Sequence, residues 1–214
     1  MTKKVPLIIE SLSVARLLLQ ARPPYTEFKG KLFDAERIVD KSVEGNIFRT
    51  FGGLPEKPSY CYRHWGRSIY SRLRAALESA QSQQDYNSVV QDFAGQLAVA
   101  WRDTMNSKLP YGPATKMINL LIKTMFLTDQ IELRSLPQWY NVPFDSFTLV
   151  PLISIIDELL SGYSFGIPMN RYMTMNYVIC EEQYHHLQQA VRVLCVGTTR
   201  TPLDYELWAW DSQH

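Results

Sequence analysis

The chain has 214 residues, of which 46% are hydrophobic and 20% are charged, and its formal net charge is +1. This length fits one domain with a substantial core, and the balanced charge confines any nucleic-acid surface to a local patch. The longest apolar stretch, residues 147–156, is interrupted by Pro151 and Ser154 and is too short to cross a bilayer, which takes about 20 residues.

The first 80 residues alternate between helical and irregular patterns. Hydrophobic spacing predicts a helix over residues 8–21 and another over residues 68–80. Between them, residues 23–67 are rich in glycine and proline, which predicts loops, a short helix near residues 33–39 and a β-hairpin around residues 47–62. This part of the chain is therefore expected to be the least regular.

Beyond residue 80 the hydrophobic spacing predicts four further helices, at residues 85–105, 113–128, 145–160 and 181–195. Asp85 and Asp145 stand at N-cap positions, Pro113 favours a helix start, and Gly197 closes the last helix. The connections are a tight turn at residues 109–112 and loops at residues 129–144 and 162–170, and the tail at residues 202–210 is aromatic and acidic. The expected fold class is all-α (mostly α).

The three cysteines, Cys61, Cys180 and Cys195, are widely spaced and odd in number. This argues against a disulfide framework and fits a reducing cytoplasm. There is no C-x-x-C or H-E-x-x-H motif for zinc, and scattered thiols cannot hold a four-cysteine iron–sulfur cluster. The apolar run at the N-terminus is too short for a signal peptide. We expect a cytoplasmic protein without a zinc site or an iron–sulfur cluster.

A lysine near the start of the helix at residues 113–128 is the first candidate for chemistry. Helical geometry puts Lys116, Asn119 and Lys123 on one face, opposite an apolar face. Such a stripe is usually a solvated surface. In the first turn, however, the helix dipole disfavours a positive charge, and partial burial would also favour the neutral amine, which is the nucleophilic form.

The second candidate is Asp145, which follows Pro143 and precedes an apolar run. Its structural role is to cap the helix that it opens, which contributes about 1 kcal/mol. A capping carboxylate is rigidly held and can also face a cleft. Asp145 lies 29 residues after Lys116, a separation that allows one helix, a long loop and a return to the same end of the structure.

Two aromatic segments could hold a nucleic acid. Residues 60–74 contain four arginines and four Tyr or Trp residues with no acid, so Arg63 and Arg67 could contact phosphates and Trp65 a base. The alternative is an amphipathic helix whose aromatic residues pack inside. Trp139 and Tyr140, shortly before Asp145, could wall a base pocket or simply pack the loop down.

The pattern over residues 105–160 resembles the active-site element of the helix-hairpin-helix DNA glycosylase superfamily. Glycosylases of this kind carry Leu-Pro-Gly-x-Gly before a lysine helix and Pro-x-Asp after it, and this chain has Leu109-Pro110, Gly112, Lys116 and Pro143-Phe144-Asp145. Tyr111 replaces one glycine and the turn is one residue shorter, so the hairpin is degenerate. Within this superfamily the chain most resembles the archaeal 8-oxoguanine glycosylases, whose hairpin is also atypical. It also resembles a bacterial anti-phage glycosylase that removes glucosylated hydroxymethylcytosine.

The resemblance implies a set of site residues and a function that needs no metal or organic cofactor. Lys116 would attack C1′ of the deoxyribose, and Asp145 would stabilise the sugar cation and assist proton transfers, with strand cleavage through a Schiff base as a further step. The residues expected to contact DNA are Gly112, Tyr111, Asn119, Lys123, Arg63 and Arg67. Those expected to line the base pocket are Trp65, Trp139 and Tyr140.

The resemblance also implies an architecture of two helical lobes with the active-site cleft between them. One lobe would contain both termini, at about residues 1–60 and 146–214, and the other would contain the lysine helix, at about residues 68–145. The expected partner is double-stranded DNA containing a modified base, bound by a monomer in repair or in defence against modified phage DNA. The alternative is a non-catalytic helical module that binds DNA or a protein.

Overall fold

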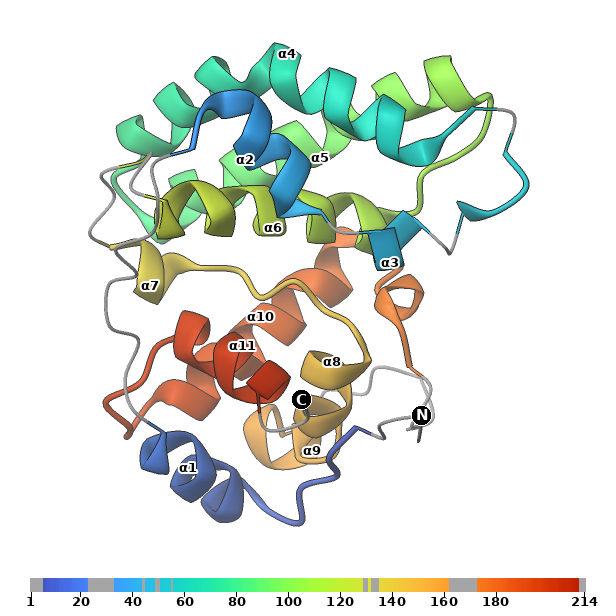
Figure 1. Ribbon diagram of the computed structural model, residues 1–214. Helices are drawn as coiled ribbons and strands as arrows, with labels where there is room; N and C mark the ends of the chain where they lie inside the picture. The colour runs from blue at the N-terminus through green and yellow to red at the C-terminus, as the bar shows by residue number, and fades with distance from the viewer. Residues whose placement is uncertain are drawn as a thin grey trace. The chain divides into compact units, whose positions relative to one another are not determined.

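The computed structural model describes residues 6–22, 33–43, 45–48, 51–54, 56–128, 131, 135–161 and 173–211. Every regular element in these ranges is a helix and none is a strand, so the predicted all-α class is confirmed for the described part of the chain (Figure 1). The chain divides into two compact units. Unit 1 comprises Met1–Thr26 and Tyr140–His214, and unit 2 comprises Glu27–Trp139.

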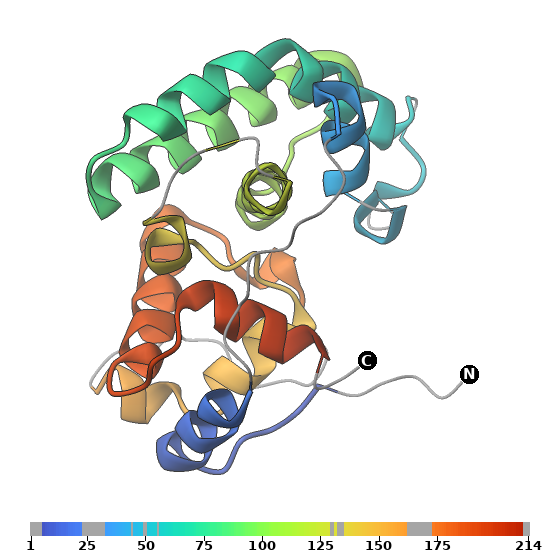
Figure 2. The same ribbon diagram turned by 60° about the vertical axis from the view of Figure 1, so that its left-hand side comes forward.

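In unit 2, two long helices lie side by side and two shorter ones pack against them. The long pair is α4 (Pro58–Ser79) and α5 (Gln83–Met105). Helix α6 (Tyr111–Leu127) packs against α5, and α2 (Ala35–Ser42) packs against both α4 and α6 (Figure 2). The one-turn helices α3 (Gly45–Phe48) and α7 (Leu136–Trp139) complete the unit. The core that these helices share includes Tyr62, Leu73, Leu97, Trp101, Met117 and Leu121.

The division of the chain differs from the expected lobe boundaries near residues 60 and 145. The segment that carries α2 belongs to unit 2, because the buried side chains of Ile38 and Val39 join the same core as the lysine helix α6. The second division lies after Trp139, because Trp139 packs against the core of unit 2.

The predicted β-hairpin around residues 47–62 is wrong, because α4 begins ten residues earlier than the sequence indicated. Pro58 occupies the first helical position, where its fixed φ is favourable and its missing N–H is no loss. The side chains of Cys61, Tyr62, Trp65 and Ile69 then follow the helical period and are all buried. Aromatic residues that suggested a strand therefore belong to the apolar face of a helix.

The sequence predicted Asp85 as the N-cap of α5, but the N-cap is Ser82. Ser82 Oγ accepts from the N–H of Asp85 at 3.1 Å and donates to Asp85 Oδ2 at 2.9 Å. The same Oδ2 accepts from the N–H of Gln81 at 3.0 Å. Asp85 is therefore the third residue of a reciprocal capping arrangement, which satisfies N–H groups that the helix leaves without partners.

Unit 1 is built around α10 (Glu181–Cys195), which packs against α1 (Leu12–Ala21), α8 (Ser146–Ile153), α9 (Ile156–Leu159) and α11 (Pro202–Asp211). Helix α11 also packs against α1 and α8. A short 3₁₀ turn, η2 (Met175–Tyr177), precedes α10. The limits of α10 and the left-handed Gly197 (φ 81°) that follows it confirm the prediction.

The helix predicted at residues 145–160 is two short helices. Helix α8 contains Pro151, which cannot donate to the helical ladder, and the chain leaves the helix at Ser154. Ser154 Oγ donates to the carbonyl of Pro151 at 2.7 Å, and α9 begins two residues later. The tail 202–210, to which no element was assigned, is helix α11. The loop predicted at 162–170 lies outside the described residues, and so do residues 23–32 of the irregular segment and residues 129, 130 and 132–134 of the loop at 129–144.

Candidate active site

Lys116 is a buried lysine in unit 2. Helix α6 begins at Tyr111, two residues earlier than predicted, so Lys116 is its sixth residue and lies in the second turn and not the first. The exposed fraction of Lys116 is 7%, and no other Lys or Arg of the described residues is buried. Lysine is among the residue types that are least often buried, so the position is unusual for its chemistry.

The polar residues around Lys116 are also withdrawn from solvent. Asn119 is fully buried and Lys123 is half-buried, so the face predicted to carry them is not a solvated stripe. Thr115 is buried as well, and its hydroxyl donates to the backbone carbonyls of Tyr111 (3.1 Å) and Gly112 (3.0 Å). Helix α6 is thus buried on nearly all sides, as is typical of a central helix.

The connection from α5 to α6 differs from the predicted turn at residues 109–112. Helix α5 ends at Met105, its C-cap Asn106 has a left-handed backbone (φ 48°, ψ 37°) that reverses the chain, and Pro110 is the N-cap of α6. Gly112 therefore lies inside the helix. Tyr111 is held by a hydrogen bond of 2.6 Å from its hydroxyl to Gln91 Oε1 on α5. The predicted DNA contacts of Gly112 and Tyr111 stay predictions, now at the first turn of α6.

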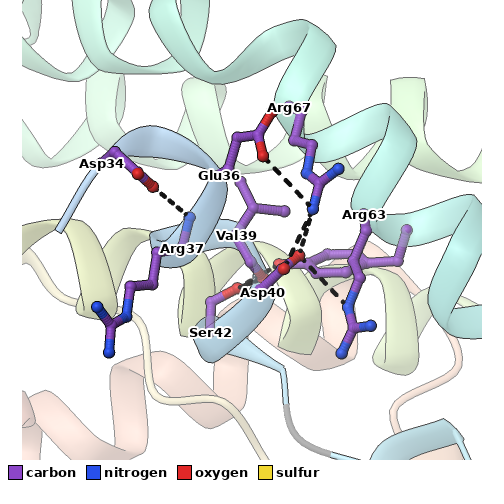
Figure 3. A network of polar contacts seen from close by, with 9 residues as sticks. Asp34, Glu36, Arg37, Val39, Asp40, Ser42, Arg63 and Arg67 are labelled. Atoms are coloured by element: carbon purple, nitrogen blue, oxygen red, sulfur yellow. Dashed lines mark hydrogen bonds and ion pairs between the residues drawn. The ribbon is translucent and has the colours of Figure 1, made fainter.

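Arg63 and Arg67 on α4 are paired with acidic residues of α2 (Figure 3). Arg67 Nη2 donates to both carboxylate oxygens of Asp40, at 3.0 and 3.1 Å, and lies 4.0 Å from Glu36. Arg63 Nε lies 3.5 Å from Asp40. The arginine-rich segment therefore has acidic neighbours that are distant in sequence, and its local positive charge is reduced.

The aromatic residues predicted to line a base pocket are packed. Trp65 has an exposed fraction of 7% and its ring lies 6.5 Å from that of Tyr62 in the core of unit 2. Trp139 packs against the same core, and its carbonyl accepts from Gln83 Nε2 at 2.9 Å. Tyr140, in unit 1, is fully buried. A base stacks on an accessible ring face, so we leave Trp65 and Tyr140 out of the proposed site.

Asp145 is the N-cap of α8 in unit 1, as the sequence predicted. Its Oδ1 accepts from the N–H groups of Phe147 at 2.9 Å and Thr148 at 3.2 Å. Thr148 Oγ1 in turn accepts from the N–H of Asp145 at 2.9 Å, which completes a capping box. The carboxylate is half-buried, and its orientation is fixed by the two hydrogen bonds that Oδ1 accepts.

The segment that leads to Asp145 is hydrogen-bonded to side chains of α10. The buried side chain of Gln188 donates to the carbonyl of Val142 and accepts from its N–H, both at 2.9 Å. Arg192 Nη2 donates to Oδ1 of the buried Asn141 at 2.6 Å. An irregular segment that runs through a protein interior must satisfy its backbone groups, and Gln188 does this as a neighbouring strand would.

On the C-terminal side of Asp145, helix α11 forms a hydrogen bond with the first turn of α8. The hydroxyl of the fully buried Tyr205 donates to the carbonyl of Thr148 at 2.6 Å. Burial, the Cys195 thiolate and the Asp145 carboxylate together raise the pKa of Tyr205 well above its ordinary value of 10.0. Tyr205 is therefore protonated, and a hydrogen-bond donor, wherever the protein is folded near neutral pH.

Three of these supporting residues were missed in the sequence. Thr148 follows Asp145 by three positions, and that capping-box spacing was a readable signal. Gln188 and Tyr205 carried no such signal, because their partners lie 46 and 57 residues away. The contacts follow from tertiary packing alone.

Comparison with known proteins gives no match to a family model, to a curated protein or to a solved structure. Within the described ranges, no group of three or more His, Cys, Asp or Glu side chains could hold a metal ion. In the same part of the chain, no helix is long and apolar enough to span a membrane.

Proposed function

We propose that this protein is a DNA glycosylase that removes a modified base, with Lys116 as the amine nucleophile and Asp145 as the assisting carboxylate. The observation that supports this most is the burial of Lys116, which is the one buried basic side chain in the described part of the chain. Lysine is among the residue types least often buried, so an amine inside a helical core is a stronger candidate for nucleophilic chemistry than a lysine on a solvated face.

The chemistry requires each residue to act at a defined atom. Lys116 Nζ forms a bond to C1′ while the bond from C1′ to the base nitrogen breaks, and the departing base keeps the electron pair and takes up a proton. The Asp145 carboxylate stabilises the positive charge that develops on the sugar. The C1′–O4′ bond of the adduct then breaks, O4′ takes up a proton, and the lysine nitrogen and C1′ form a Schiff base. Loss of a C2′ proton then breaks the C3′–O bond, and the 3′ phosphate leaves with the electron pair. Water finally releases the lysine.

The two residues belong to different units, so the proposal requires Nζ of Lys116 and the carboxylate of Asp145 to reach one deoxyribose in the DNA complex. Reacting atoms must approach to about 3–3.5 Å for efficient attack. The hydrogen bonds around Asp145 support this role, since a carboxylate with fixed orientation loses little entropy on meeting a substrate.

Borohydride trapping tests the nucleophile without knowledge of the base. A duplex with one abasic site presents the C1′ aldehyde directly, and reduction converts the Schiff base into a stable covalent complex. We expect the wild-type protein to be trapped and Lys116→Gln not to be. Lys41→Gln is the matched control, because it removes an exposed lysine of α2 in the same unit and should trap as the wild type does. Equal trapping by Lys116→Gln would remove this lysine from the mechanism.

Base release from a panel of duplexes identifies the substrate class. The panel should contain oxidised, alkylated, deaminated and glucosylated hydroxymethylated bases, each assayed with wild-type protein and Lys116→Gln. Release that depends on Lys116 for an oxidised base would favour a role in repair. Release confined to glucosylated hydroxymethylcytosine would favour defence against modified phage DNA.

The alternative of a non-catalytic DNA-binding module has less support. It relies on the arginines of residues 60–74, and the two that lie nearest α2 are paired with Asp40 and Glu36. That alternative expects binding that depends on the four arginines Arg63, Arg67, Arg72 and Arg74. It expects the same binding to be indifferent to Lys116 and Asp145. Its affinity should also fall steeply with salt.

A further inference from the structure

The segment that carries Asp145 is held by contacts from two other helices of unit 1. Before Asp145, Gln188 and Arg192 on α10 form hydrogen bonds with Val142 and Asn141, respectively. After Asp145, Tyr205 on α11 donates a hydrogen bond to Thr148. The residues between these points, from Pro143 to Phe147, carry the cap itself. A helix cap alone needs only the local hydrogen bonds between Asp145 and the first turn.

The contact from α11 acts on the residue that completes the capping box. Thr148 accepts from the N–H of Asp145 through Oγ1 and donates its own N–H to Asp145 Oδ1. The carbonyl of the same residue accepts from Tyr205. Both Thr148 and Tyr205 are fully buried, so neither can replace this bond by one to water without opening the core.

We propose that Tyr205 is a positioning residue for Asp145: through Thr148 it fixes the direction in which the carboxylate points. The inference rests on the proposed glycosylase function for its catalytic meaning. Helix α8 is only eight residues long and contains Pro151, so it is a weak scaffold by itself. The hydroxyl of Tyr205 supplies the anchor that such a helix lacks.

Amide hydrogen exchange, measured without DNA, tests the geometric part. In Tyr205→Phe the N–H groups of Phe147 and Thr148, which donate to Asp145, should exchange roughly fivefold faster, the effect of one lost hydrogen bond. Tyr62→Phe is the matched control. It removes a buried hydroxyl with one side-chain partner, Ser42 at 2.8 Å, from unit 2, and should leave those two amides unchanged.

A pair of variants at Thr148 separates positioning from packing. Thr148→Ser keeps the hydroxyl that accepts from Asp145, whereas Thr148→Val keeps the shape and loses it. We expect Thr148→Val to reproduce the faster exchange and Thr148→Ser to resemble the wild type. Exchange at Phe147 and Thr148 that stays within twofold of the wild type in Tyr205→Phe would overturn the inference.

Single-turnover kinetics test the catalytic part with a duplex that contains 8-oxoguanine opposite cytosine. Tyr205→Phe should lower the rate of base release about tenfold at saturation and leave the half-saturating DNA concentration unchanged, as expected for lost orientation. A wild-type protein that neither releases base from the panel nor is trapped on abasic DNA would refute the proposed function. An active Tyr205→Phe with unaltered exchange and rate would refute only the role of Tyr205.

Discussion

Arg67 on α4 donates from Nη2 to both carboxylate oxygens of Asp40 on α2, at 3.0 and 3.1 Å. Arg63 reaches the same carboxylate, so Asp40 connects two arginines of one helix to the helix that packs beside it (Figure 3). These side chains are between 37% and 43% exposed, which means that water screens the attraction.

Asp40→Asn should therefore lower the free energy of unfolding only modestly, by about 0.2–1 kcal/mol. The loss should shrink when unfolding in urea is repeated at about 1 M NaCl, because salt screens exposed charges at this distance. Glu78→Gln, which breaks the i,i+4 pair with Arg74, is a control of the same kind within one helix. A loss above about 3 kcal/mol would mean that Asp40 holds α2 in a way that surface ion pairs do not.

Two glycines inside long helices should respond to alanine in opposite directions. A Cβ at Gly66 would lie 2.8 Å from Cγ1 of Val39, which is buried and stiff at χ1, so Gly66→Ala forces α2 and α4 apart. We expect a net loss of about 1–3 kcal/mol in the free energy of unfolding, even after the better helix propensity of alanine.

Gly95, on α5, is exposed, and nothing lies within 4 Å of its added Cβ. Gly95→Ala should therefore raise the free energy of unfolding by about 0.5–1 kcal/mol. Urea unfolding of Gly66→Ala and Gly95→Ala measures the sign of each change in the free energy of unfolding. Shifts of the same sign would show that the close approach at Gly66 is not a constraint on helix packing.

The sequence predicted those parts of the fold that local signals determine. The limits of α10, the left-handed Gly197 and the cap at Asp145 each follow from residues within a few positions of one another. The hairpin prediction failed because aromatic residues such as Tyr62 favour strands by propensity, whereas the helical period that buries Tyr62 together with Trp65 in a larger core determined the outcome.

In the candidate site, too, the local features could be predicted from the sequence and the features that depend on tertiary packing could not. The capping role of Asp145 was readable from the sequence, but the burial of Lys116 and Asn119 was not, because it depends on packing around α6 that the wheel of one helix cannot reveal. Likewise, Arg63 and Arg67 stand in a segment without acids, and their partners Asp40 and Glu36 come from a helix more than 20 residues earlier.

The free energy of unfolding should fall at alkaline pH, because buried thiol and phenol groups must stay protonated in the folded state. Burial and Asp204 raise the pKa of Cys195 to about 12 from 9.0, against smaller opposite effects of Arg192 and Arg16. The unfolded thiol ionises from about pH 9, so the stabilisation is complete below that pH and is lost as the pH rises toward 12, by up to about 1.4 kcal/mol per pH unit.

Urea unfolding between pH 8 and pH 10 measures this slope. Cys195→Ala should have a shallower decline than the wild type, whereas Cys180→Ala, at an exposed cysteine, should decline in parallel with it. Above about pH 10 the buried Tyr62 and Tyr205, whose pKa values burial also raises, should steepen the loss in all three proteins. A slope that is identical in Cys195→Ala and the wild type would locate the alkaline sensitivity elsewhere.

Asp145→Asn should separate the two halves of the proposed reaction. Asparagine is as good an N-cap as aspartate, so its side-chain oxygen can still accept from Phe147 and Thr148 and the fold should be retained. What the variant loses is the negative charge beside the sugar. Base release, which passes through a cationic sugar, should slow by about 100-fold or more.

Trapping on an abasic duplex should be affected much less, because the base has already left and the amine of Lys116 meets an aldehyde. Asp157→Asn, at an exposed acid of α9, should change neither rate and controls for the loss of one charge in unit 1. The rates of base release and of trapping, measured on matched duplexes, test the role of Asp145. Equal losses in release and in trapping would assign Asp145 to orientation of the lysine or of the DNA, because a carboxylate that acts on the sugar cation is needed only while the base departs.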